Sequence, residues 1–182
     1  MNHADHVMLL RSGVPGPGGV WADFGSGTGA FTLALAELIS PAGRIFSVDK
    51  NSGALRQQER SLHARFPQVA VQHVVADFAR PLDLPLLDGA VMANALHFLR
   101  HAARDAAVQL MRGYLRPGGR FILVEYNVDR GSPWVPYPLS YRTWKEVVRR
   151  NGFANTQLLT TRPSRFLGEI YSALSWQPGD TE

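Results

Sequence analysis

The chain contains no cysteine, which excludes disulfides, thiolate metal sites and cysteine nucleophiles. Long uncharged hydrophobic runs are also missing, because a stretch such as Leu84–Leu87 is far too short to span a membrane. The first residues lack the basic end and the following apolar run of a signal peptide. The sequence therefore predicts a cytoplasmic protein without a membrane partner.

Lysine is nearly absent as well. Lys50 and Lys145 are the only lysines among 19 Lys and Arg residues, which face 15 Asp and Glu residues and leave a formal net charge of +4. No run of four or more cations occurs. A nucleic-acid-binding surface usually needs a denser basic patch with aromatic side chains between the charges. We therefore expect no nucleic-acid partner.

The 182 residues fit one domain over residues 1–182, and 45% of them are hydrophobic, as in ordinary globular proteins. Strand-like segments at 19–24, 44–48, 69–75, 89–93 and 120–125 alternate with helix-like segments at 30–40, 52–66 and 102–115. Such alternation predicts βαβ crossovers and hence a mostly parallel sheet that helices cover on both faces.

The last third of the chain departs from this alternation. Ser140 can cap a helix that runs to Arg150. Two strand-like segments follow at 155–160 and 169–176, without room for a helix between them, so we expect them to pair antiparallel across a turn near Pro163. The expected fold class is α/β: a Rossmann-like doubly wound sheet of about seven strands, mostly parallel, with an antiparallel C-terminal hairpin.

A glycine-rich loop, Asp23–Gly29, joins the first predicted strand to the first predicted helix. Glycines let the backbone turn tightly and let a ligand approach closely, and the amides at the start of a helix can face an anionic group. Ligands of open parallel sheets bind beyond the carboxyl ends of the strands, where this loop lies. The loop is therefore the predicted centre of a binding site.

The loop fits two templates. Gly25, Gly27 and Ala30 match the dinucleotide-binding fingerprint. Gly25, Gly27 and Gly29, with Asp23 two residues ahead, resemble the loop of class I S-adenosylmethionine-dependent methyltransferases. Both families place an acid at the end of the second strand, so Asp49 does not separate them.

Three later features favour the methyltransferases. Asp77 closes the third predicted strand, where that family carries an acid. Segment 87–98 resembles the family's fourth motif, and segment 115–124 resembles its helix–turn–strand before the last parallel strand. Together with the reversed terminal hairpin, they make the chain similar to a class I methyltransferase over residues 5–176, and most similar to the small-molecule branch that includes quinone-biosynthesis enzymes.

This resemblance implies S-adenosylmethionine as cofactor, with S-adenosylhomocysteine as its product. It implies that Asp23 faces the ammonium group, that Asp49 accepts hydrogen bonds from the ribose hydroxyls and that Asp77 accepts one from the adenine amino group. Phe78 either covers the adenine or belongs to the core. The full set of implied cofactor residues is Asp23, Gly25, Ser26, Gly27, Thr28, Gly29, Asp49, Lys50, Asp77, Phe78 and Asn94.

The implied acceptor is a small organic molecule that is methylated on O, N or C. His97 is the candidate catalytic base because imidazole titrates near neutral pH; the alternative is a histidine packed under the loop. Rigid aromatic side chains with polar tips are the candidate acceptor wall, unless they merely cover the sheet edge. These are Tyr126, Trp134, Tyr137 and Tyr141.

Several alternatives stay open. His97 and His101 have helical spacing but no carboxylate near them in sequence, so we expect no metal site. Segment 3–11 is the only candidate lid, and a homodimer is compatible with the sequence. A dinucleotide-binding oxidoreductase and a catalytically silent relative are the competing functions.

Overall fold

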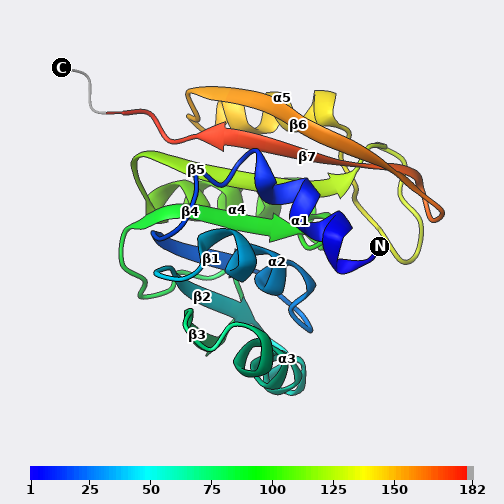
Figure 1. The fold of residues 1–182 in the computed structure, drawn as a ribbon. Coiled ribbons are helices and arrows are strands. Elements are labelled where there is room, and N and C mark those ends of the chain that lie inside the picture. The colour runs from blue at the N-terminus through cyan, green and yellow to red at the C-terminus, as the bar shows by residue number, and fades with distance from the viewer. Residues whose placement is uncertain (180–182) are drawn as a thin grey trace.

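A computed structural model describes residues 1–179, so residues 180–182 of the predicted domain lie outside the described residues. The fold is built on a seven-stranded sheet with the order β3-β2-β1-β4-β5-β7-β6 (Figure 1). The strands are β1 (Val20–Phe24), β2 (Arg44–Asp49), β3 (Ala70–Val75), β4 (Leu87–Ala93), β5 (Leu115–Tyr126), β6 (Asn155–Ser164) and β7 (Gly168–Trp176). The first five are parallel, and β7 is antiparallel to β5 and β6. The predicted fold class is confirmed.

Helices cover both faces of this sheet. Their bounds are α1 (His3–Arg11), α2 (Ala30–Ile39), α3 (Ser52–Arg65), α4 (His101–Tyr114) and α5 (Tyr141–Arg150), with the short 3₁₀ helix η1 (Leu96–Phe98) after β4. In Figure 1, α1 and α2 lie in front of the sheet, whereas α4 and α5 lie behind it. The α5 helix begins as predicted, since Ser140 accepts a hydrogen bond from the Thr143 backbone N–H.

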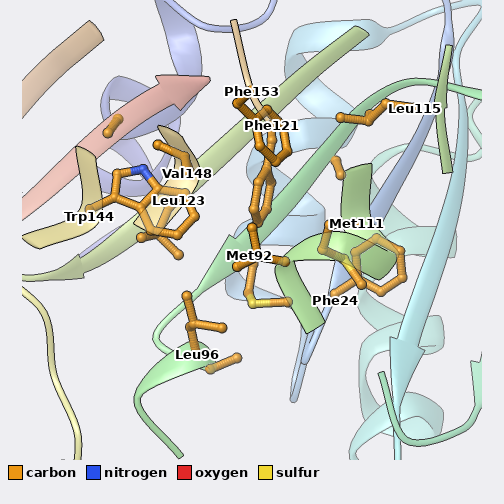
Figure 2. Packing of buried hydrophobic residues seen from close by; sticks show 14 of the residues in the cluster. Phe24, Met92, Leu96, Met111, Leu115, Phe121, Leu123, Trp144, Val148 and Phe153 are labelled. Atoms are coloured by element: carbon orange, nitrogen blue, oxygen red, sulfur yellow. The ribbon is translucent and has the colours of Figure 1, made fainter. Parts of the chain in front are cut away.

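The alternation of side chains along the strands divides the core into two layers. In β5, Phe121 and Leu123 point to the α4 and α5 side, where the Phe121 ring meets the edge of Trp144 at 5.6 Å between centroids (Figure 2). Ile122 and Val124 point to the opposite layer, under α1 and α2. Because both faces of the central strands are buried, the ends of these strands are held firmly.

Two local predictions need correction. Pro163 does not form the hairpin turn: it lies in β6 opposite Glu169, and the turn falls at 165–167. A proline is tolerated there because β6 is an edge strand. β5 begins at Leu115 rather than at residue 120, because Leu115 pairs with Leu87 before the register shifts.

The order of the strands locates the expected ligand crevice. From β1 the chain proceeds outward to β2 and β3, and it then returns to β4 on the other side of β1. The switch point of the sheet therefore lies between β1 and β4, and a ligand crevice is expected beyond their carboxyl ends.

Candidate functional site

A cleft of about 340 Å³ opens at this switch point. The segments that follow β1, β2, β3 and β4 contribute to its wall. The lining residues are Gly25, Asp49, Lys50, Ala76, Asp77, Phe78, Asn94, Ala95, Phe98 and Leu99. Six residues predicted to bind the cofactor are thus brought together, although they come from four separate parts of the chain.

Gly25 lines the cleft, and Gly27 lies two residues further along the same loop. Both adopt a left-handed backbone, with φ of +73° and +54°, which side chains other than glycine rarely adopt. A Cβ at Gly25 would come within 2.5 Å of the Ala95 Cβ, whereas a Cβ at Gly27 would meet no atom within 4 Å. Gly25 is therefore required for packing, and Gly27 faces open space.

Asp49 holds the loop from the end of β2. Its carboxylate accepts hydrogen bonds from the backbone N–H groups of Gly27 and Asn51, at 2.8 Å each. A carboxylate offers about four lone-pair positions, so Asp49 can still accept hydrogen bonds from a ligand.

Asp77 and Phe78 form the opposite wall. Asp77 is exposed, and its carboxylate accepts a hydrogen bond from the Ala79 N–H at 2.9 Å. Phe78 is half-buried, and it both lines the cleft and packs against the α4 and α5 core. The two interpretations of Phe78 are therefore compatible, because one side chain contacts the core and the cleft at once.

Asp23 lies beneath the loop and does not line the cleft. It is 1% exposed and accepts a hydrogen bond from the Thr32 hydroxyl at 2.6 Å. Burial raises the pKa of Asp23 to about 7, the Thr32 hydrogen bond opposes this rise, and the charge of Asp49 adds to it. Thr32 also accepts a hydrogen bond from the Gln58 amide. Asp23 thus belongs to a buried polar network under the loop.

The remaining loop residues also lie outside the cleft lining. Ser26 accepts a hydrogen bond from the Ser47 hydroxyl at 2.8 Å, and Thr28 is exposed. Gly29 is the N-cap of α2 with φ of +91°, and a Cβ there would collide with the Gln58 side chain. These residues shape the turn from β1 into α2.

Asn94 lines the cleft and carries an unpaired, buried acceptor. Its backbone is left-handed, with φ of 51°, and its buried side-chain oxygen has no hydrogen-bond partner among residues 1–179. Buried polar atoms without a partner are rare in native proteins. The orphaned oxygen and the open space at Gly27 fit a bound ligand that carries hydrogen-bond donors.

A buried pair, His97 and Glu125, lies beside the cleft. His97 follows β4 in η1 and is 3% exposed, while Glu125 is completely buried in β5. The His97 Nδ1 lies 2.9 Å from each carboxylate oxygen of Glu125. Sequence reasoning missed Glu125, although an acid near the carboxyl end of a parallel strand is the same signal that pointed to Asp49.

Aromatic rings continue from the cleft past His97. The His97 ring lies 4.4 Å from Phe98 and 6.1 Å from Tyr126, and Tyr126 lies 6.0 Å from Phe166 in the β6–β7 turn. Phe98 and Phe166 are both exposed. We call Phe98, Tyr126 and Phe166 the aromatic row. Phe166 was not predicted, because only the tertiary fold brings the hairpin turn to Tyr126.

The other predicted acceptor residues have different surroundings. Trp134 is exposed, and the Tyr137 hydroxyl accepts a hydrogen bond from the Arg100 side chain at 2.8 Å. Tyr141 packs at the start of α5 against Tyr171 and does not line the cleft. Segment 3–11 packs as α1 on α2 and the hairpin.

A second cleft, of about 370 Å³, opens at the amino ends of the strands. Of its two basic residues, Arg116 already pairs with Asp88, and Arg120 donates a hydrogen bond to the Gly13 carbonyl oxygen at 3.1 Å. Parallel sheets bind ligands at the opposite edge, so the cleft at the switch point is the candidate site. Within residues 1–179, no three His, Asp or Glu side chains come together as metal ligands, and no helix is both long and apolar enough to cross a membrane.

The sheet order, the reversed last strand and the cleft at the switch point define a doubly wound α/β protein with one ligand-binding edge. Residues 22–119 match the family described as methyltransferase domain, and the chain belongs to that family.

Two relatives share about a third of their aligned residues with the chain. An uncharacterized 37.1 kDa protein in transposon TN4556 of Streptomyces fradiae is 34% identical over 124 residues, which cover 67% of this chain and 34% of that protein. The ubiquinone/menaquinone biosynthesis C-methyltransferase UbiE of Burkholderia mallei is 30% identical over 127 residues, which cover 69% of this chain and 49% of that enzyme. The matched part thus spans half or less of either relative.

Among solved structures, the fold is similar to that of 1,6-didemethyltoxoflavin-N1-methyltransferase from Burkholderia thailandensis, which was crystallised with 1,6-didemethyltoxoflavin and S-adenosylhomocysteine. The TM-score is 0.76 at 19% identity, and the match covers 97% of this chain and 78% of that one. At this identity the similarity shows the shared fold.

Proposed function

We propose that residues 1–182 form a single methyltransferase domain that transfers a methyl group from S-adenosylmethionine to a small organic acceptor and releases S-adenosylhomocysteine. One observation carries the proposal. The cleft at the switch point gathers Asp49, Asp77 and the orphaned Asn94 oxygen beside an open glycine loop. Membership of the methyltransferase domain family supports it. The expected location is the cytoplasm, as the sequence predicts.

In this proposal each wall of the cleft holds one part of the cofactor. Asp49, with Lys50 beside it, would accept hydrogen bonds from the ribose hydroxyls, and Asp77 would accept one from the adenine amino group while Phe78 covers the ring. The Asn94 oxygen would accept a hydrogen bond from the amino-acid part. Asp23 lies beneath the loop, and in its ionised form it would attract the positively charged ammonium group of the cofactor from there.

The chemical demand on the protein is modest. S-adenosylmethionine supplies a methyl group on a positively charged sulfur, which is already electrophilic. The protein therefore has mainly to align an acceptor, and alignment alone can lower a barrier by about 7–11 kcal/mol. The aromatic row, together with Trp134 and Tyr137, suits an apolar or aromatic acceptor.

Calorimetric titration with S-adenosylhomocysteine, with NADH and NADPH run in parallel, tests the proposal. We expect micromolar binding of S-adenosylhomocysteine and no binding of either nicotinamide nucleotide. Binding of a nicotinamide nucleotide alone would mean that the loop belongs to the dinucleotide template. Binding of S-adenosylhomocysteine without turnover of any acceptor would leave a catalytically silent relative.

A further inference from the structure

The contact between His97 and Glu125 carries an inference that rests on the proposed function and deepens it. We infer that Glu125 positions His97 as the base of the methyl transfer, and that the acceptor therefore presents a hydroxyl or N–H group. Glu125 is a positioning residue in this account, because it acts through His97.

The first step concerns the surroundings of the Glu125 carboxyl group. Its carboxylate is completely buried, accepts a hydrogen bond from the Tyr126 backbone N–H at 2.8 Å, and lies 2.9 Å from the His97 Nδ1. Hydrogen bonds from donors favour the ionised form of a carboxyl group. Burial lowers the pKa of the nearby Arg104 guanidinium, and Glu125 opposes that lowering. The buried Glu125 oxygens are therefore placed to accept hydrogen bonds inside the protein.

The second step concerns the histidine tautomer. In the inferred arrangement Glu125 is the acceptor of this contact, so the His97 Nδ1 carries the proton. The neutral ring then has its free lone pair on Nε2. Within residues 1–179, the His97 Nε2 has no hydrogen-bond partner. It is also not one of the unpartnered atoms that are buried away from solvent. The Nε2 atom is thus the one left to accept a proton from a bound molecule.

The third step concerns the position of the ring. The Tyr137 backbone N–H donates to the His97 carbonyl oxygen at 3.0 Å, and the ring lies near both Phe98 and Tyr126. Phe98 also lines the cleft. His97 is therefore fixed at the junction between the proposed cofactor cleft and the aromatic row, where a planar acceptor would meet the methyl group.

The reaction balances without another reactant. The acceptor's O–H or N–H bond breaks, and the proton moves to the His97 Nε2. The electron pair on the acceptor atom forms the bond to the methyl carbon, while the bond from that carbon to sulfur breaks and its pair stays on sulfur. The resulting imidazolium is stabilised by the Glu125 carboxylate, and the proton then passes to solvent.

The tautomer is tested directly by nitrogen NMR of the histidine rings in the unmodified protein, with His97→Gln used to assign the signals. We expect a protonated, pyrrole-type Nδ1 and an unprotonated, pyridine-type Nε2 in the neutral ring. A protonated Nε2 with a bare Nδ1 would overturn the inference, because a neutral Glu125 would then be the donor.

The role in turnover is tested with Glu125→Gln, and Glu169→Gln is the matched control. Glu169 is a half-buried acid in β7 whose carboxylate accepts a hydrogen bond from Asn127 instead. The probes are phenol, which is mostly neutral at pH 9, and 4-nitrophenol, which is almost fully ionised there, and released S-adenosylhomocysteine is measured. We expect Glu125→Gln to slow phenol turnover by about 100-fold or more, with a much smaller loss for 4-nitrophenol and little change in the control.

The remaining outcomes separate this inference from the proposed function. An equal loss with both phenols would mean that Glu125 has a purely structural role. If the unmodified protein binds S-adenosylhomocysteine but methylates neither phenols nor aromatic N–H compounds, the inference is wrong while the proposed cofactor stands. If S-adenosylhomocysteine does not bind, the proposed function itself is wrong.

Discussion

The two halves of the site are built differently. The proposed cofactor half consists of backbone turns and short polar side chains, each at or just after the carboxyl end of a parallel strand, between residues 23 and 94. The acceptor half joins His97, Glu125, Tyr137 and Phe166, which come from η1, β5, a loop and the hairpin turn. The first half follows from strand order, whereas the second exists only once distant segments have packed together.

This difference has an energetic side. The cofactor half is open where Asp49 and Asp77 line the cleft, and both of these carboxylates accept hydrogen bonds from backbone N–H groups. The acceptor half contains a completely buried carboxylate, which is costly unless it is paired and hydrogen-bonded. We therefore expect changes in the cofactor loop to alter binding or local strain, and changes in the acceptor half to alter turnover.

The largest expected effect on stability compares two glycines of the same loop. Gly25→Ala should cost about 1–2 kcal/mol for the left-handed backbone and about 1–3 kcal/mol more for the collision with Ala95. Gly27→Ala should cost only the backbone part, because its Cβ would meet open space. Urea unfolding measures both. Equal losses would show that Gly25 has no special packing role.

The next effect is the pH dependence caused by Asp23. Its pKa is about 7 in the folded chain and about 3.8 as a reference, so the folded state holds its proton more tightly. Stability from this group is therefore greatest below about pH 4 and falls until about pH 7. Asp23→Asn should remove this fall and be more stable than the unmodified protein at pH 8. Thermal unfolding of both proteins at pH 4 and pH 8 tests this. If Asp23→Asn loses as much stability between the two pH values as the unmodified protein does, the prediction is wrong.

A smaller effect is expected for the acids that rim the cleft. Asp49→Ala should weaken S-adenosylhomocysteine binding by at least about tenfold, or about 1.4 kcal/mol, because the ribose hydroxyls lose their acceptor. The control is Asp83→Ala, since Asp83 is exposed and does not line the cleft. Calorimetry measures both affinities. An unchanged affinity in Asp49→Ala would remove Asp49 from the cofactor site.

The smallest effect on stability belongs to the exposed aromatic wall. Trp134 is 76% exposed, so Trp134→Ala should change the free energy of unfolding by no more than about 0.5 kcal/mol. If this side chain contacts the acceptor, KM for the acceptor should rise while S-adenosylhomocysteine affinity stays the same. An unchanged KM would restrict the acceptor site to the aromatic row.

The contrast also explains what could be predicted from the sequence. Asp49 and Asp77 could be predicted from the sequence, because a strand pattern and the acid that ends it are local signals. Parallel strands then bring those ends to one edge of the sheet. Glu125 was missed because its proposed role depends on its contact with His97, which lies 28 residues away in sequence. Tyr141 was expected beside the acceptor, but α5 turns it toward Tyr171. Such placements depend on tertiary packing, which periodicity does not encode.

The most direct test of the central claim is a crystal structure with bound S-adenosylhomocysteine. The account predicts that the ligand occupies the cleft at the switch point, with Asp49 within hydrogen-bond distance of the ribose and the sulfur on the side of Phe98 and His97. A ligand in the cleft beside Arg116, or one whose sulfur faces away from His97, would contradict it.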